Sequence, residues 1–130
     1  MAKMHKTPEA ISRQLTRRIT KDAARPNEIR DAAFRRMILS IPKGSVATYG
    51  QVAAAAGYPL YHRAVARLLR HTPNDLLPWQ RVVGADGAIK LRFEAAAEQR
   101  LRLEMEGVTF CGRKVDLASH QHQFRGWELE

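Results

Sequence analysis

The only cysteine of the chain is the residue best suited to covalent chemistry. Cys111 would act as a nucleophile only if a neighbouring base or a helix N-terminus lowered its pKa. Its neighbours Phe110 and Gly112 indicate a loop or a strand edge, where only Arg113 and Lys114 would favour a thiolate. We therefore interpret Cys111 as a passive thiol.

The histidines give only weak evidence for a metal site. His120 and His122 form a His-x-His pair in a polar segment near the C-terminus, with no third ligand nearby. The sequence has no Gly-rich phosphate loop, no His-Glu-x-x-His motif and no nucleophile elbow. A single cysteine excludes a disulfide within the chain and disfavours a cysteine-based zinc site. We predict no metal, no cofactor and a reducing, cytoplasmic location.

A basic stripe and one tryptophan favour nucleic acid as the partner. Arg63, Arg67 and Arg70 share one face of a predicted helix over residues 61–70. The chain has 22 Lys and Arg against 13 Asp and Glu, a net charge of +9. Such an excess attracts polyanions, because each neutralised phosphate releases a condensed counterion. Trp79 has a flat face on which a base could stack, although from composition alone a core role is slightly more typical of tryptophan.

Two short helices joined by a tight turn would present this stripe. Thr48 and Gln51 form a capping box, which predicts a helix start, and Gly57 is suited to end that helix. The basic helix over residues 61–70 follows directly. This pattern, two helices joined by a glycine-containing turn with a basic second helix, is typical of a helix-turn-helix. It also fits an ordinary helical hairpin.

The flanking segments predict a mainly α fold with a small β-hairpin. Apolar spacing over residues 29–41 indicates a first helix, and residues 94–106 a last one. The inner face of that last helix is expected to consist of Ala97, Leu101 and Met105. Residues 82–90 are expected to form the hairpin around an Asp-Gly turn.

The length of 130 residues suits one domain, which we divide into three segments. Residues 1–27 form a basic arm, residues 28–117 the compact domain and residues 118–130 a polar tail. The arm holds seven Lys and Arg against two acidic residues, so it either adds DNA affinity or is simply solvated. No apolar run approaches the roughly 20 residues of a membrane span, and we expect no membrane contact.

Several motifs follow one another in a fixed order across residues 28–117. They are the segments Ile41-Pro42-x-Gly44-x-Val46-x-Thr48-Tyr49-Gly50, Ala53 to Gly57, Arg63-Ala64-Val65, Pro78-x-x-Arg81-Val82-Val83 and Glu106-Gly107-Val108. Their order resembles the C-terminal domain of O6-alkylguanine-DNA alkyltransferases. The resemblance implies a winged-helix-like helix-turn-helix domain of the alkyltransferase C-terminal type.

The sequence departs from that family at its active site. The family motif reads Pro-Cys-His-Arg-Val, and this chain reads Pro78-Trp79-Gln80-Arg81-Val82. Tryptophan cannot accept an alkyl group as the family's thiolate does, and Gln80 has no proton to relay near neutral pH. The departure resembles the alkyltransferase-like proteins, which bind alkylated DNA and mark it for nucleotide excision repair.

The resemblance also implies roles for individual residues. Arg63 would fill the gap left by the extruded nucleotide, and Tyr49 would help to rotate that nucleotide out. Gly50, Ala64 and Arg67 would complete the DNA-binding surface. The alkylbase pocket would be formed by Trp79, Val82 and Arg92, with Arg92 as a lid over the base. Glu106 would support the fold.

The resulting hypothesis is a non-enzymatic sensor of DNA damage. It would bind duplex DNA containing O6-alkylguanine, flip the lesion out and recruit nucleotide excision repair proteins, acting as a monomer in the cytoplasm, or on the nucleoid if the protein is bacterial. Two alternatives stay open: an active alkyltransferase that uses Cys111, and a transcription factor that reads sequence through Arg63, Arg67 and Arg70.

Overall fold

The computed structural model describes residues 26–125. The predicted basic arm therefore lies almost wholly outside the described residues. A helix covers residues 26–39, and the chain divides after Arg30 into two units. The second unit begins at Asp31 and is described as far as residue 125. In the part of the chain described here, no helix combines the length and apolar character needed to cross a bilayer.

The predicted helix-turn-helix forms. Helix α2 covers Tyr49–Ala55 and helix α3 covers His62–His71. The Thr48 hydroxyl accepts from the Gln51 backbone N–H at 3.0 Å, and the Gln51 side chain accepts from the Thr48 N–H at 2.9 Å. This reciprocal capping box fixes the start of α2. Gly57 follows its end with a φ of +93°, a conformation that suits glycine at this position.

A short parallel strand pair contributes side chains to two separate hydrophobic clusters of this unit. Strand β1, Ala47–Thr48, pairs in parallel with β2, Val82–Val83, with Ala47 opposite Val82. Alternate side chains of a strand point to opposite faces. Ala47 and Val82 accordingly enter one hydrophobic cluster, and Val46 and Val83 enter another.

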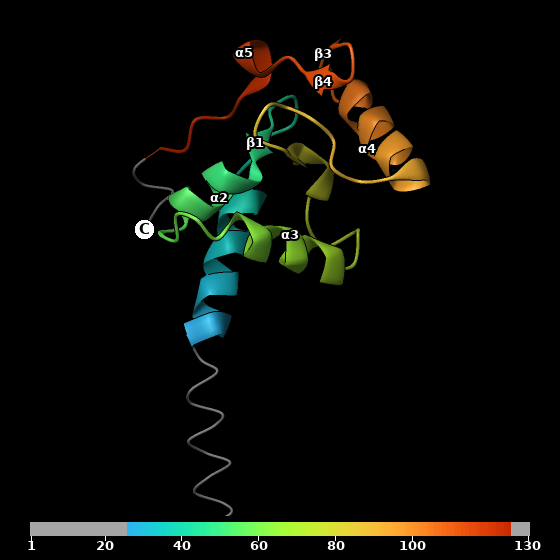
Figure 1. The fold of residues 1–130 in the computed structure, drawn as a ribbon. Helices are drawn as coiled ribbons and strands as arrows, with labels where there is room; N and C mark the ends of the chain where they lie inside the picture. Colours follow the sequence, from blue (N-terminus) through green and yellow to red (C-terminus); the bar gives the residue numbers. More distant parts are fainter. Residues whose placement is uncertain (1–25, 126–130) are drawn as a thin grey trace, which may run out of the picture. The chain divides into compact units, whose positions relative to one another are not determined.

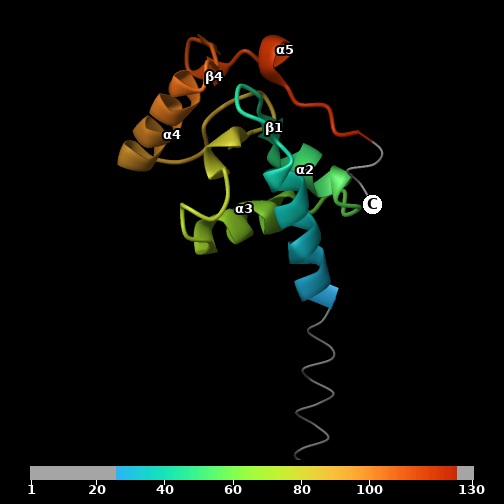
Figure 2. The same ribbon diagram turned by 180° about the vertical axis from the view of Figure 1, so that it is seen from behind.

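The two clusters lie on either side of this strand pair. The first contains Phe34, Met37 and Ile38 of the first helix, packed against α2 and α3. The second contains Leu103 of helix α4, Phe93–Met105, together with Val108 and Val115. Figures 1 and 2 show α3 on one side of β1 and α4 with strand β4 on the other.

The prediction of a hairpin over residues 82–90 is wrong, because the hairpin of this fold lies elsewhere in the chain. Strand β2 pairs with β1, and residues 84–88 form only a turn, closed by the Gly84 N–H on the Ala88 carbonyl. The hairpin of this fold consists of β3, Phe110–Cys111, and β4, Lys114–Val115. Turn chemistry predicts a reversal of the chain, but it does not decide which strand the flanking residues pair with.

The predicted inner face of α4 is also wrong. Leu101 and Met105 are exposed, whereas Gln99 and Leu103 are the buried residues of this helix. The stripe that faces inward is thus displaced by two residues. The helix has an alanine or a polar residue at most positions, so hydrophobic spacing alone chose the wrong face.

The boundary of the polar tail requires a correction. Helix α5, Leu117–His120, follows β4, and Gln121 forms a parallel bridge with Val46. The Val46 N–H donates to the His120 carbonyl at 2.9 Å, and the His122 N–H donates to the Val46 carbonyl at 2.7 Å. The backbone therefore docks this segment, although its side chains are polar.

Gly87 is a site where the fold requires glycine. Its φ is +89°, and a Cβ there would lie 2.6 Å from the Val115 carbonyl oxygen. Gly107 has nearly the same φ, +90°, but a Cβ there would meet no atom within 4 Å. Gly107→Ala should therefore lose about 1–2 kcal/mol from backbone strain alone.

Gly87→Ala adds a backbone clash to that strain and should lose about 3 kcal/mol or more. Urea denaturation of both variants measures the two free energies of unfolding. Equal losses would show that the turn at residues 84–88 moves freely away from β4.

Candidate nucleic-acid interface

Helix α3 presents a basic face beside a cavity. The cavity has a volume of about 720 Å³, within the range of small-molecule sites, roughly 300–1,000 Å³. Arg63 and Arg70 of α3 line it, and Arg67 is exposed outside it. Tyr49 and Gly50 contribute the start of α2 to the wall. Cations at the mouth of a cavity draw a polyanion toward it.

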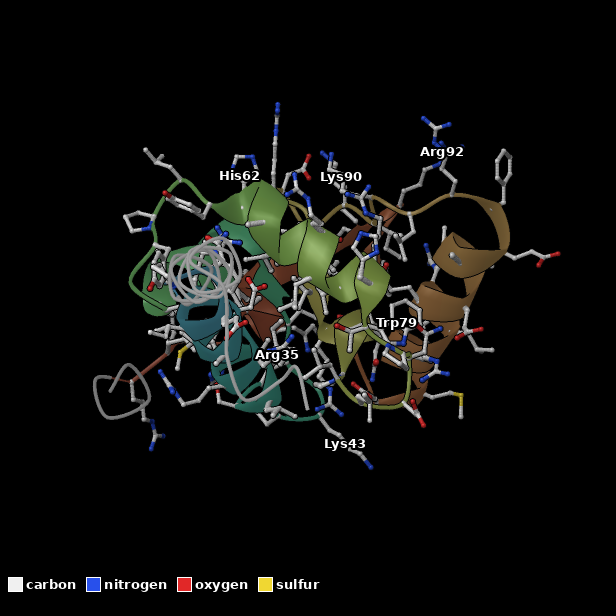
Figure 3. All side chains as sticks on the ribbon, turned by 90° about the horizontal axis from the view of Figure 1, so that it is seen from below. Arg35, Lys43, His62, Trp79, Lys90 and Arg92 are labelled. Carbon is white, nitrogen blue, oxygen red and sulfur yellow. The ribbon has the colours of Figure 1, made fainter. Side chains whose placement is uncertain are left out.

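The far wall consists of the segment before β2, the loop after it and α4. Trp79 belongs to a 3-10 turn, η2, Trp79–Arg81, which precedes β2. In Figure 3, Trp79 lies between α3 and α4, and His62 and Lys90 point to the same side of α3. Residues that line the cavity and were missed by sequence reasoning include His62, Ala66, Leu69, Lys90, Leu91 and Gln99.

Two residues predicted for the pocket are placed elsewhere. Val82 is fully buried in the first hydrophobic cluster, because its side chain faces the opposite side of the strand pair. Arg92 is the exposed residue that precedes α4, and it is absent from the cavity wall. Figure 3 shows its side chain extending away from the loop. Ala64 is half-buried against the first cluster, so it supports α3 from behind.

Tyr49 presents an uncharged phenol hydroxyl at the edge of the cavity. Burial raises the pKa of its phenol, and the charge of Arg70 offsets this only in part. The hydroxyl therefore keeps its proton at neutral pH. A protonated phenol can donate a hydrogen bond to a phosphate oxygen, which a phenolate would repel.

Gln80, Arg81 and Glu106 form a hydrogen-bonded network behind Trp79. Arg81 donates through Nε at 3.0 Å and through Nη2 at 2.9 Å to the two carboxylate oxygens of Glu106, and through Nη1 at 2.9 Å to the Ile41 carbonyl. Gln80 Nε2 donates to Glu106 Oε2 at 2.8 Å. The ion-paired side chains are only 13% and 12% exposed. Bidentate geometry of this kind orients both partners.

Two polar atoms in residues of the cavity wall are buried inside the protein and have no partner among the described residues. They are Oε1 of Gln99 and the indole Nε1 of Trp79. A buried polar group left unsatisfied costs about 1–3 kcal/mol. The Arg102 guanidinium lies 5.4 Å from the centre of the Trp79 ring, so one face of the indole is turned toward a cation.

The remaining reactive residues lie apart from the cavity. Cys111 is exposed on β3 and does not line the cavity. The Nδ1 atom of His120 is 2.9 Å from the Gly44 carbonyl, and its Nε2 is 2.9 Å from the Thr109 hydroxyl. This histidine therefore has a structural role in docking α5. Within residues 26–125, no three acidic, histidine or cysteine side chains cluster as metal ligands.

Fold and site together define a helix-turn-helix domain with a ligand-sized cavity at its basic face. The family model for the DNA-binding domain of 6-O-methylguanine DNA methyltransferase matches residues 30–108. The chain belongs to this family.

Relatives in this family include proteins described by base flipping. The DNA base-flipping protein of Vibrio parahaemolyticus is 44% identical over 73 residues, which are 55% of this chain and 73% of that protein. The alkyltransferase-like protein 1 of Schizosaccharomyces pombe is 43% identical over 74 residues, 55% of this chain and 68% of that protein.

The fold is also similar to structures solved with DNA. S. pombe Atl1 in complex with damaged DNA containing O6-carboxymethylguanine matches with a TM-score of 0.65 and 29% identity, over 75% of this chain and 97% of that one. Mycobacterium tuberculosis OGT in complex with DNA matches with a TM-score of 0.54 and 31% identity, over 58% of this chain and 48% of that one. The predicted fold class is confirmed by these similarities.

The Arg81–Glu106 pair predicts a dependence of stability on pH. Burial alone would raise the pKa of Glu106, but hydrogen bonds from Arg81 and Gln80 and the charges of Arg81 and Lys43 outweigh it and lower the pKa below 4.5. A lowered folded pKa stabilises the fold above the unfolded value, and this stability is lost as pH falls through the folded pKa.

Glu106→Gln should therefore lose about 1–3 kcal/mol of unfolding free energy at pH 7. The difference from the parent protein should shrink as the pH is lowered well below 4.5. Urea denaturation at several pH values measures both quantities. A difference that stays constant with pH would show that the Glu106 charge does not stabilise the fold.

Proposed function

We propose that this protein is a non-enzymatic DNA-damage sensor that binds duplex DNA and flips O6-alkylguanine into its cavity. The observation that carries the proposal is a cavity of about 720 Å³ that adjoins a basic helix and is lined by Trp79 without any thiol. A flipped base needs a pocket of suitable size with an aromatic wall on which it can stack. Similarity to proteins named for base flipping, and to Atl1 solved with damaged DNA, supports the same reading.

The absence of transfer chemistry follows from Trp79 in the cavity wall and from Gln80 beside it in the sequence. Trp79 stands where the family's reactive cysteine would stand, and Gln80 replaces the histidine beside it. The Gln80 amide is held by Glu106 at 2.8 Å and has no titratable proton near neutral pH. Cys111 lies outside the cavity. A flipped alkylguanine would therefore be held without being repaired.

The DNA contacts would be divided among four residues. Arg63 lies where α3 borders the cavity, and its planar guanidinium can replace the extruded base in the stack. Tyr49 would donate its hydroxyl to the phosphate of the flipped nucleotide. Gly50 offers no side chain to obstruct the backbone of the DNA, and Arg67 would bind a phosphate beyond the cavity.

The proposed function includes a step after the lesion has been bound. A sensor that does not repair must pass the lesion on, and we propose nucleotide excision repair proteins as the recipients. We also propose that the protein acts on DNA as a monomer in the cytoplasm, or on the nucleoid if the protein is bacterial. A monomer is sufficient because all the proposed contacts arise from one chain.

Arg63 and Arg67 provide a matched test, since both are exposed arginines of α3 and only Arg63 lines the cavity. Binding is measured at several salt concentrations to two duplexes that differ only in guanine or O6-methylguanine. The parent protein should prefer the lesion. Arg63→Ala should weaken binding to the lesion duplex about tenfold or more while changing binding to the guanine duplex much less.

Arg67→Ala should weaken binding to both duplexes alike and reduce the slope of log K against log salt by about 0.9. Equal binding of the parent protein to both duplexes would overturn the sensor proposal. An equal loss on both duplexes in Arg63→Ala would remove Arg63 from lesion recognition.

A further inference from the structure

Two exposed apolar residues share an unusual backbone conformation. Leu60 has a φ of +77° and Phe93 a φ of +52°, and no other described residue except glycine has a positive φ. They are also the most exposed large hydrophobic residues in that part of the chain, at 91% and 87%. A left-handed backbone crowds the Cβ of an L-residue, and a side chain left in water gains nothing from burial. Each residue therefore carries two costs at once.

Both residues belong to segments that border the cavity without lining it. Leu60 lies in the turn between α2 and α3, two residues before His62, which lines the cavity. Phe93 begins α4, three residues after Lys90, which also lines it. In Figure 3, His62, Lys90 and Arg92 project to the same side of α3. Leu60 thus belongs to the α3 side of the cavity and Phe93 to the α4 side.

The charges near these two side chains suit a polyanion. Arg63 follows Leu60 by three residues, and the exposed Arg92 directly precedes Phe93. An apolar protein surface would have to face these cations, whereas DNA offers phosphates to the cations and base faces to the apolar side chains. Proteins that bind the minor groove combine Arg and Lys with apolar wedges such as Leu and Phe, which enter between base pairs and kink the duplex.

We propose that Leu60 and Phe93 are two wedges that enter the duplex on either side of the flipped nucleotide and bend it, an inference that rests on the proposed function. Neither side chain belongs to a hydrophobic cluster of the fold, so both are available to DNA. Each wedge separates one base step, and the bend brings more of the duplex against the basic face. Backbone strain of this kind is characteristic of functional sites.

Glycine substitution separates DNA binding from folding at these positions. Glycine adopts a positive φ readily, and side chains this exposed bury little surface on folding. Leu60→Gly and Phe93→Gly should therefore unfold at the same urea concentration as the parent protein or at a higher one. Each should bind a duplex containing O6-methylguanine about tenfold more weakly. If a glycine variant does not fold, asparagine takes its place, since asparagine also tolerates a left-handed backbone.

Energy transfer between dyes at the two ends of that duplex measures the bend. The parent protein at saturation should bring the ends closer together than in free DNA. Leu60→Gly and Phe93→Gly at saturation should each produce a smaller bend, and the double variant the smallest. Leu101→Ala is the matched control, because it removes an exposed leucine of α4 that does not line the cavity. It should bind and bend the duplex as the parent protein does.

The outcomes separate this inference from the proposed function. A parent protein that prefers O6-methylguanine to guanine, with glycine variants that bind and bend like it, keeps the sensor and overturns the wedges. Weaker binding of the variants with an unchanged bend also overturns them, because no base step would then be separated. So does an effect of the variants on self-association of the free protein alone. A parent protein with no preference for O6-methylguanine over guanine overturns the proposed function itself.

Discussion

The guanidinium of Arg81 joins three segments that are far apart in the chain. It binds the Ile41 carbonyl, two residues after the first helix, and the Glu106 carboxylate at the end of α4, and it belongs to η2. Charge-assisted, bidentate bonds with little solvent access tolerate few alternative geometries. Because Trp79 and Gln80 are the two preceding residues, this single side chain also sets where the wall of the cavity lies.

The strand pair β1–β2 extends this constraint to the DNA-binding side. Ala47 and Val82 point into the cluster beneath α2 and α3, while Val83 points into the cluster beneath α4. The α3 side and the α4 side of the cavity are therefore both attached to one strand pair. The cost of the arrangement falls on Gln99 and Trp79, whose buried polar atoms have no partner in the part of the chain that the structure describes.

Local signals in the sequence predicted local structure well. The Thr48–Gln51 capping box, the glycine at position 57 and the stripe of α3 each depend on neighbouring residues, and each forms. The pairing of β1 with β2 and the docking of Gln121 beside Val46 depend on contacts between distant segments, which spacing does not reveal. Trp79 could be assigned to the cavity from its motif. Gln99 could not, because a polar residue in an alanine-rich helix is usually solvated, and only its i,i+4 relation to Leu103 hinted at burial.

The cavity is proposed to bind an alkylated base without reacting with it. The most direct test incubates the protein with duplex DNA containing O6-methylguanine, then measures the mass of the intact protein and the base composition of the DNA. The account predicts an unchanged protein mass and complete recovery of O6-methylguanine from a bound complex. A gain of one methyl group by the protein, with guanine restored in the DNA, would contradict it and would direct attention to Cys111.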